Sequence, residues 1–324
     1  MIKLIIDTIK DHQIEEFCSY FNGQIHQQKL IYQPMPITTF TEIFYEESEN
    51  NKKINIACWE NNTIIGYASG CLNLETLTPF LTLVIITQSY QRIGIGTKLY
   101  QLLENKLKNY TTHSLKISFF NPVKIPWFLQ DQQKRTHPTV PGVLIDSISY
   151  KFFQKLGFND VVKQNVYLLE LEKFSLSNKV QKKIEELKNK DIEIEFYNPM
   201  KHQNFDELFF DLKNDDWKEV ITTALNNDKE KLPILVLTHN RTVIGFSGPL
   251  QVETCGRGYF NGIGIHSNYR NMGAGKLLFS MLCHYFKEMG ASYMTLFTGE
   301  ENKARYIYEK AGFEIVHSFM VMEK

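Results

Sequence analysis

The 324-residue chain contains one long internal repeat, and this repeat limits its possible folds more than any other feature. The segment "TIIGYASG" at 63–70 resembles "TVIGFSG" at 242–248, and "SYQRIGIG" at 89–96 resembles "NYRNMGAG" at 268–275. Both pairs are offset by 179 residues. A period of this length is far too long for a solenoid, so the sequence predicts two copies of one domain.

A third pair of segments shows where the two copies differ. "FFQKLGF" at 152–158 and "IYEKAGF" at 307–313 are offset by 155 residues, so the first copy has 24 additional residues before this point. We place them within 121–146, a segment with four prolines and a polar tract. This composition predicts an inserted loop.

The boundary between the copies is predicted within a charged segment. Val180, Ile184 and Leu187 fall on one helical face of this segment, which indicates a linker helix. The expected divisions are an N-terminal domain over 1–172, a linker helix over 173–190 and a C-terminal domain over 191–324.

Both copies predict the same order of elements. A β-hairpin with an Asn-containing turn leads to a strand at 80–86 or 259–265, and then to the glycine-rich turn. An amphipathic helix follows, then a strand at 115–120 or 293–297, a short helix and a last strand. The predicted apolar stripe of the amphipathic helix is Leu99, Leu102, Leu103 and Leu107 in the first copy and Leu278, Met281, Leu282, Tyr285 and Met289 in the second. Antiparallel strands that lead into a strand–turn–helix–strand unit predict an α/β fold with a mixed sheet, of the α+β type.

The composition excludes several classes of function. The 36 basic and 36 acidic residues leave no net charge for binding nucleic acid. The five cysteines are scattered and odd in number, which indicates reduced thiols and a cytoplasmic protein. No run of about 18 apolar residues exists, so we expect no membrane contact. No His pair has H-E-x-x-H spacing, and we expect no metal.

The glycine-rich turns have the composition of a phosphate-binding segment. A Walker loop is excluded because Arg270 stands where its first Gly should be. A Rossmann fingerprint is excluded because Leu278 and Leu99 stand where its last Gly should be. Both turns fit [R/Q]-x-x-G-x-[G/A] between a strand and a helix. The glycines let backbone N–H groups approach an anion at a helix N-terminus.

With this turn in both copies, each followed by "aromatic-x-K-x-G-F", the chain resembles the GNAT (GCN5-related N-acetyltransferase) superfamily over nearly its whole length. The resemblance implies two tandem GNAT acyl-CoA N-acyltransferase domains, with acetyl-CoA as co-substrate and its pyrophosphate on the turn. The implied coenzyme-binding residues are Gln91, Arg92, Ile93, Gly94, Ile95, Gly96 and Thr97 in the first copy and Arg270, Asn271, Met272, Gly273, Ala274, Gly275 and Lys276 in the second.

N-acetylation requires a neutral amine, stabilisation of an oxyanion and a proton for the leaving thiolate. Backbone N–H groups of the strand before the turn, around Ile263 and Ile265, are candidates for the oxyanion. The resemblance implies that Asn302 contacts the pantetheine arm, although it could also cap the short helix. It also implies that Tyr308, four residues before the Gly of Gly-Phe, protonates the thiolate.

A base for the amine is harder to identify. A lysine-like amine has a pKa near ~10.4, so it must lose a proton before it attacks. His266 follows the central strand, and histidine is a residue type whose ordinary pKa suits a base. Glu253 precedes that strand and is a comparable candidate. A chain of ordered water leading to solvent is an equally good interpretation.

The first copy departs from the pattern at its acid position. Phe153 stands where Tyr308 is expected, and Ser147 stands where Asn302 is expected. Tyr150 lies one turn earlier, at a different level of the helix. We therefore expect the first copy to have a degenerate catalytic site and the second copy to be catalytic. The first copy could still bind coenzyme A, and its proline-rich insertion could shape a pocket.

The acceptor is expected to be a primary amine of a small molecule or a peptide, and nothing in the pattern specifies an oligomeric state. Segment 205–220 corresponds to the helices that flank the acceptor in GNAT folds, and its acids and aromatics could attract and enclose an amine. These residues are Asp206, Glu207, Asp211, Asp215, Asp216, Phe209, Phe210 and Trp217. A solvated amphipathic helix is the simpler interpretation. The alternative functions are a non-catalytic CoA-binding scaffold or sensor and another acyl transfer, such as aminoacyl transfer.

Overall fold

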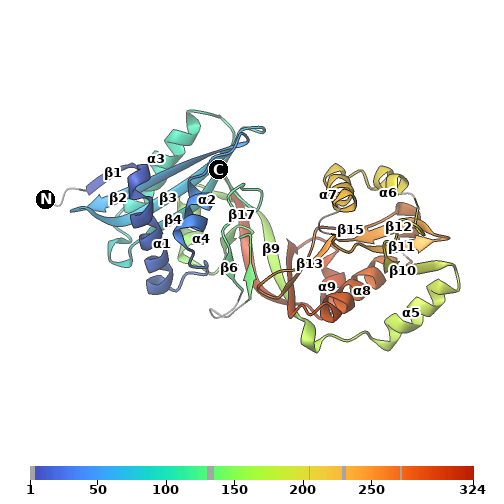
Figure 1. Cartoon of the computed structure of the whole chain (residues 1–324). Coiled ribbons are helices and arrows are strands. Elements are labelled where there is room, and N and C mark those ends of the chain that lie inside the picture. Colours follow the sequence, from blue (N-terminus) through green and yellow to red (C-terminus); the bar gives the residue numbers. More distant parts are fainter. Residues whose placement is uncertain (1–3, 130–134, 204, 228–230, 271) are drawn as a thin grey trace. The chain divides into compact units, whose positions relative to one another are not determined.

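The computed structural model describes residues 4–129, 135–203, 205–227, 231–270 and 272–324. The chain forms two compact units (Figure 1). The first contains residues 1–165 and 316–324, and the second contains residues 166–315. Each unit combines helices with a mixed sheet, which confirms the predicted α/β fold class.

The first unit is built on a sheet in the order β1-β2-β3-β4-β5-β17. Adjacent strands of this sheet are antiparallel, except that β4 and β5 pair in parallel at Phe80 and Lys116. The strands are β1 (Leu4–Thr8), β2 (Asn51–Glu60), β3 (Thr63–Asn73), β4 (Thr78–Ile86), β5 (Lys116–Ile117) and β17 (Glu314–Glu323). Three two-residue strands also form, namely β6 (Trp127–Phe128), β7 (Thr136–His137) and β8 (Val143–Leu144). The long strand β9 (Asn159–Glu170) follows.

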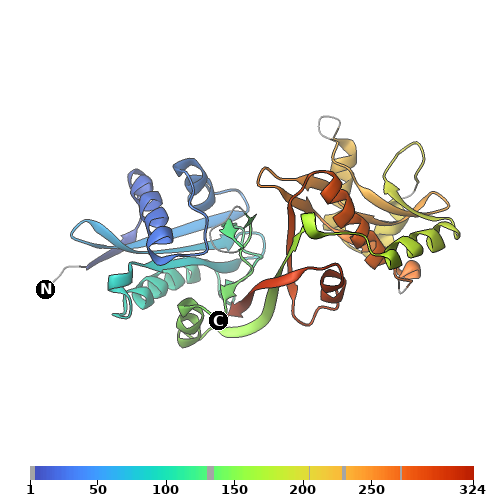
Figure 2. The ribbon, with the colours of Figure 1, turned by 90° about the horizontal axis from the view of Figure 1, so that it is seen from below.

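Helices cover both faces of this sheet. Figure 2 shows α1 (Ile14–Gln28) and α2 (Ile37–Phe44), in blue, on the face opposite α3 (Ile95–Lys108) and α4 (Ile148–Lys155). The first pair packs Phe17, Phe21, Phe40 and Phe44 against the sheet. The second face is filled by Leu99, Leu103 and Leu107 of α3, which are residues of its predicted apolar stripe.

The second unit contains two groups of strands. One runs β10-β11-β12-β15, and the other runs β9-β16-β14-β13. The strands are β10 (Ile192–Phe196), β11 (Leu235–His239), β12 (Thr242–Ser247), β13 (Leu250–Val252), β14 (Arg257–Phe260), β15 (Ile263–Ile265) and β16 (Tyr293–Gly299). The single strand predicted over 259–265 is therefore two strands, β14 and β15, and each pairs with a different neighbour.

The helices of the second unit also divide between two faces. In Figure 1, α6 (Phe205–Leu212) and α7 (Asp215–Asn226) lie on one side, and α8 (Ala274–Glu288) and α9 (Arg305–Lys310) lie on the other. The predicted core residues Leu278, Met281 and Leu282 of α8 are buried. Tyr285 is only half-buried and Met289 caps the helix C-terminus, so the apolar stripe ends earlier than predicted.

The predicted repeat is visible in the backbone conformation. The hairpin turn between β2 and β3 has two left-handed residues, Asn61 (φ 47°) and Asn62 (φ 64°). Asn240 (φ 50°) and Arg241 (φ 67°) do the same between β11 and β12, again 179 residues later. Two consecutive left-handed residues suit the right-handed twist of a two-residue hairpin. The two copies therefore share turn geometry as well as sequence.

The last strand of the chain belongs to the first unit. Met322 of β17 pairs with Ile117 of β5, and its side chain is fully buried in the first unit's core. Lys324 Nζ lies 3.0 Å from Tyr100 Oη and 3.3 Å from Glu104 Oε1. Residues 166–170 of β9 belong to the second unit in turn. The units thus differ from the divisions expected at 172 and 191, because each copy's final strand is shared with the other unit.

The segment expected to be a linker helix is helical but is not separate. It forms α5 (Asn178–Lys188), whose N-terminus is capped by the Ser177 side chain, which accepts a hydrogen bond from the backbone N–H of Val180. Val180, Ile184 and Leu187 pack in one cluster with Leu277 of α8. α5 is therefore an integral helix of the second unit. No helix in the described part of the chain is long and apolar enough to cross a membrane.

Candidate active site

A left-handed glycine begins the central helix in both copies. The chain leaves β4 through a short 3-10 helix, Gln88–Tyr90, and Gly94 (φ 90°) is the N-cap of α3. It leaves β15 through Ser267–Tyr269, and Gly273 (φ 83°) is the N-cap of α8. Neither helix has a side-chain cap at this end. Both therefore present unpaired N–H groups and a positive dipole to an anion.

The two turns differ in the space beside their second glycine. A Cβ on Gly275 would contact only Ile265 Cγ1 within 4 Å, at 3.8 Å. A Cβ on Gly96 would lie 3.3 Å from Cζ of Phe152, whose ring packs against the first turn. The second turn is thus the more open of the two, as the approach of a ligand to the backbone requires.

Two lysines meet at the second turn. Lys276 is the third residue of α8, and the Lys310 ammonium beside it lowers the pKa of Lys276. Like charges repel each other unless an anion lies between them. The open glycine, the uncapped helix and these lysines fit the pyrophosphate of coenzyme A.

The second turn is tied to helix α6. Asp211 accepts hydrogen bonds from the Ser267 backbone N–H at 2.7 Å and from Ser267 Oγ at 2.5 Å. The hydrogen bond from the Ser267 hydroxyl is the main reason why the pKa of Asp211 is lowered. Arg270 donates from Nε to the Ile265 carbonyl at 3.0 Å and lies 3.8 Å from Asp211. Asp211 therefore fixes the turn and is not free to attract an amine.

The first turn has an uncharged version of this arrangement. Gln91 donates from Nε2 to the Ile86 carbonyl at 3.1 Å and to Gln28 Oε1 at 2.8 Å. Gln28, on α1, also donates to the Ile86 carbonyl at 2.9 Å. In both copies, therefore, the first residue of the turn motif donates to the carbonyl of the last strand residue and lies beside a helix side chain, which is the Gln28 amide in one copy and the Asp211 carboxylate in the other.

The edge of β15 presents backbone N–H groups away from β12. His266 N donates to Ile244 O across this ladder at 2.9 Å, and Gly264 pairs with Phe246. Because successive residues of a strand point to opposite neighbours, the N–H groups of Ile263 and Ile265 point to the other edge. β15 ends its sheet there. These N–H groups are suitably oriented for a thioester or an oxyanion.

Tyr308 lies in the same apolar cluster as Ile263 and Ile265. Its ring packs against Phe279, Phe313 and Tyr167 at centroid distances of 5.1, 6.2 and 6.0 Å. No described side chain hydrogen-bonds its hydroxyl, and burial raises its pKa. Tyr308 therefore holds a transferable proton at neutral pH, as a general acid requires.

The remaining predicted residues of the second turn have varied environments. Asn302 does not cap α9, because the N-cap is Ala304; its Oδ1 instead accepts from Ala304 N at 2.9 Å. Ala274 is buried, and Met272 is 37% exposed. Asn271 lies outside the described residues. The structure leaves the side-chain amide N–H groups of Asn302 without a protein acceptor among the described residues.

Glu253 is poorly placed to act as a base. Arg257, which is almost fully buried, donates to it from Nε at 2.8 Å and from Nη2 at 2.6 Å, and this lowers the pKa of Glu253. Its hairpin adjoins Ser292, just beyond the C-terminus of α8, since Ser292 N donates to Gly256 O at 2.9 Å. A 15-residue helix is about 22 Å long, and the glycine turn lies at its other end.

His266 is also held within the turn. Its Nδ1 accepts from Asn268 N at 3.2 Å, so this nitrogen is not free to accept a proton from an amine. Its Nε2 lies 3.9 Å from Asp211 Oδ1. These contacts favour a structural role for His266. The structure therefore supports neither side chain as the general base.

The first copy lacks an acid at the matching position. Phe153 is buried and packs against Phe158 at 5.6 Å. Ser147 caps α4 and donates to the Leu144 carbonyl at 2.6 Å. Tyr150 donates to Asp160 at 2.5 Å, which directs its hydroxyl toward β9. None of the three presents a free proton donor.

The first unit nevertheless contains a cavity of about 1170 Å³ at its turn. Five of the seven predicted residues line it, namely Gln91, Arg92, Gly94, Gly96 and Thr97. The other two do not, because Ile93 is exposed and Ile95 is buried in the core. Residues of the insertion between Asn121 and Leu144 form part of the wall, so the insertion does shape a pocket.

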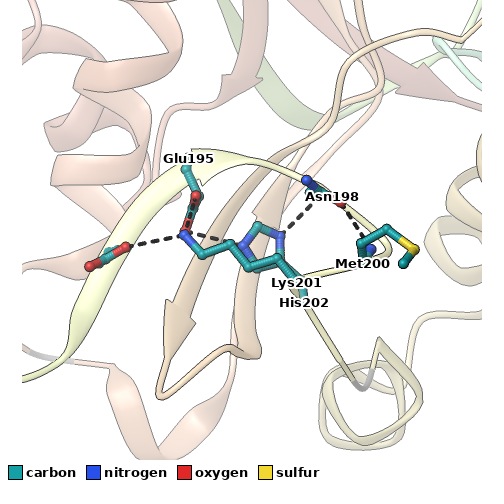
Figure 3. Close-up of polar contacts among 6 residues, drawn as sticks. Glu195, Asn198, Met200, Lys201 and His202 are labelled. Carbon is teal, nitrogen blue, oxygen red and sulfur yellow. Dashed lines mark hydrogen bonds and ion pairs between the residues drawn. The ribbon is translucent and has the colours of Figure 1, made fainter.

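The loop before α6 is fixed by a compact polar cluster (Figure 3). Lys201 Nζ lies 2.7 Å from both carboxylate oxygens of Glu195. The buried His202 lies 3.1 Å from Glu195 through Nε2 and accepts from Asn198 N through Nδ1 at 3.0 Å. This cluster holds the loop over 198–202 against β10. No group of three or more potential metal ligands occurs in the described ranges.

Known proteins match both halves of the chain. The profile of the Acetyltransferase (GNAT) family matches residues 16–126 and 191–313. A [ribosomal protein bS18]-alanine N-acetyltransferase of Haemophilus influenzae is 38% identical over 94 residues, which cover 29% of this chain and 63% of that enzyme. The chain thus spans less than two thirds of this relative.

Solved structures share the fold at low identity. A tandem GNAT protein from the clavulanic acid biosynthesis pathway matches with a TM-score of 0.60 and 10% identity, over 99% of this chain and 98% of that one. The GCN5-related glucosamine N-acetyltransferase region of a fungal multi-domain GH3 β-N-acetylglucosaminidase gives 0.70 and 14%, over 100% of this chain and 38% of that one. With both halves matched by the family profile, the chain belongs to the Acetyltransferase (GNAT) family and carries two copies of its domain in tandem.

Proposed function

We propose that the chain is an acetyl-CoA-dependent N-acetyltransferase and that its second unit transfers the acetyl group to a primary amine. One observation carries the proposal: Tyr308, half-buried and with a hydroxyl that no described side chain hydrogen-bonds, shares a cluster with the edge strand that leads into the open glycine turn. Acetyl-CoA would supply an activated acetyl thioester. The turn would hold its phosphates, and Ile263 and Ile265 would stabilise the developing oxyanion.

Neither of the two candidate bases, Glu253 and His266, is free in the structure, and this favours an acceptor that is already partly deprotonated. An α-amine has a pKa of ~7.7–8.0, against ~10.4 for a lysine side chain. At neutral pH the neutral fraction of an α-amine is therefore larger by about two orders of magnitude. Since Glu253 and His266 are both held by protein groups, we propose a peptide or small-molecule α-amine as the acceptor. The activity of the Haemophilus relative, a [ribosomal protein bS18]-alanine N-acetyltransferase, agrees with this choice.

Thiol release from acetyl-CoA over a panel of amines tests the proposal. The panel pairs a peptide having a free N-terminus and no lysine with its Nα-blocked counterpart having one lysine. We expect release with the first peptide and little with the second. Release that is independent of any amine would instead support a CoA-binding protein that hydrolyses its thioester slowly.

A non-catalytic CoA-binding role is proposed for the first unit. Its cavity reaches the glycine turn, yet Phe153 has replaced the acid. Calorimetric titration of acetyl-CoA shows whether one unit or both units bind the coenzyme. Two sites per chain indicate binding in both units. One site that disappears in Gly275→Glu indicates binding in the second unit alone.

A further inference from the structure

The cavity of the first unit has a one-sided charge. Its described lining contains Arg92, Lys151, Lys155 and Lys29, and no Asp, Glu or His. All four cations are exposed. Arg92 belongs to the glycine turn, and Lys151 and Lys155 come from α4. A cationic lining attracts an anion and repels a protonated amine.

Away from these cations, one part of the wall is apolar, although polar side chains such as Thr82, Asn121 and Thr139 also line the cavity. Leu83 and Ile85 of β4 and Val123 and Ile125 of the insertion are all more than 90% buried and line it. Val140, also from the insertion, is half-buried in the same wall. We call the space beside these five residues the acyl chamber. The repeat predicts no equivalent chamber in the second copy, because that copy lacks the insertion.

The insertion that forms the acyl chamber is firmly anchored. Phe128 N donates to Ile31 O at 2.8 Å, and Gln33 N donates to Pro126 O at 2.9 Å. The fully buried Trp127 donates from its indole N–H to the Thr139 carbonyl at 2.9 Å. The first two bonds join the described part of the insertion to the segment after α1, and the third links two parts of the insertion, so the chamber is formed before a ligand arrives. A preformed apolar chamber loses little entropy on binding.

We infer that the first unit binds a CoA thioester whose acyl chain is longer than acetyl, with the chain in the acyl chamber. The coenzyme part of this inference rests on the proposed function, which places CoA on the glycine turns. The phosphates suit the cationic turn, and a neutral hydrocarbon chain suits Leu83, Val123 and Val140. The cavity of about 1170 Å³ is many times the ~150 Å³ that holds a benzene. A protonated amine would meet cations and no carboxylate there.

Calorimetric titration of the full chain tests this inference. The chain carries Gly275→Glu, so that only the first unit's turn can hold coenzyme A. Acetyl-CoA and hexanoyl-CoA are titrated in parallel with free CoA. Each buried methylene strengthens binding, so we expect hexanoyl-CoA to bind at least about tenfold more tightly than acetyl-CoA. Val140→Trp, which fills the chamber, should remove this difference and leave the affinity for free CoA unchanged.

Two further variants sharpen the test. Val161→Trp adds the same side chain at an exposed position of β9 and should keep the hexanoyl preference. Val140→Leu makes a smaller change at the same site if Val140→Trp does not fold. Equal affinity for the two thioesters would overturn the inference, and so would a preference that persists in Val140→Trp. If Gly275→Glu binds no CoA while Gly96→Glu does, the inference is wrong and the proposed function of the second unit stands.

Discussion

Tyr308 packs against Phe279 with ring centroids 5.1 Å apart and ring planes inclined at 50°, and both rings contact Phe313. The first unit has the matching trio Phe153, Tyr100 and Phe158, with Phe158 5.6 Å from Phe153 and 5.8 Å from Tyr100. The packing is therefore retained in both copies, while the hydroxyl at the catalytic position is present in one. The ring at this position therefore serves packing in both copies, and the hydroxyl of Tyr308 is the part that catalysis would require.

Tyr308→Phe should lower kcat by about 10² to 10⁴ and leave the affinity for acetyl-CoA nearly unchanged. The ring and its contacts remain, and only the proton donor is removed. Steady-state thiol release gives kcat, and calorimetry gives the affinity. The matched control is Phe153→Tyr in the first unit, which should not change kcat. A Tyr308→Phe enzyme with full activity would remove Tyr308 as the acid.

Gly275→Glu should abolish acetyl transfer without unfolding the second unit. A Cβ at Gly275 has room, so the loss would come from a carboxylate placed against the pyrophosphate. Gly275→Ala is the steric control and should lose much less activity. Gly96→Glu should leave transfer intact. If Gly96→Glu stops transfer and Gly275→Glu does not, the catalytic unit is the first one.

The glycine turns could be predicted from sequence because their geometry is local. Gly94 and Gly273 adopt left-handed φ values that other residues rarely adopt, so the pattern alone marks the start of a helix. Asn61 and Asn62, which are also left-handed, mark the hairpin turn by their residue type in the same local way. Family and fold class follow from these local signals in their repeated order. The roles of the predicted site residues stay predictions until they are tested.

Features that depend on distant contacts could not be predicted in this way. Asp211 is 56 residues before Ser267, and nothing in the acidic segment 205–220 distinguishes it from Asp206 or Asp215. Glu253 and Arg257 are only four residues apart, so the sequence itself contained a signal that Glu253 is paired and unsuited to act as a base. The transfer of residues 316–324 to the first unit leaves no local mark at all.

Asp211→Asn should raise the KM for acetyl-CoA severalfold and change kcat little. The amide can still accept from Ser267, but it loses the charge that faces Arg270 and His266. The turn would then be held less rigidly while Tyr308 is undisturbed. Initial rates at varied acetyl-CoA test this expectation. Glu207→Gln, on the same helix, is the control; an equal effect there would indicate a general influence of charge.

The Glu195 cluster should make the second unit sensitive to acid. Burial raises the pKa of Glu195, but bonds from Lys201 and His202 outweigh it, so the pKa is lowered overall. A carboxyl with a lowered pKa stabilises the fold above the ordinary Glu value of ~4.3, and this contribution is lost as pH falls through the lowered value. Calorimetric Tm between about pH 6 and pH 3 should fall less steeply in Glu195→Gln. Identical slopes would contradict this role.

Met322→Ala should destabilise the first unit, although the residue lies at the end of the second copy in sequence. Met322 is fully buried among Ile117, Phe153 and other core residues of the first unit. Truncating a buried Met costs about 2–5 kcal/mol because it leaves a cavity. Urea denaturation followed by Trp59 and Trp127 fluorescence reports on the first unit, and a Trp217 signal reports on the second. Met289→Ala, at a partly exposed helix end, is the control and should stay within about 0.5 kcal/mol. A shift confined to the Trp217 transition would show that the last strand stabilises the second unit instead.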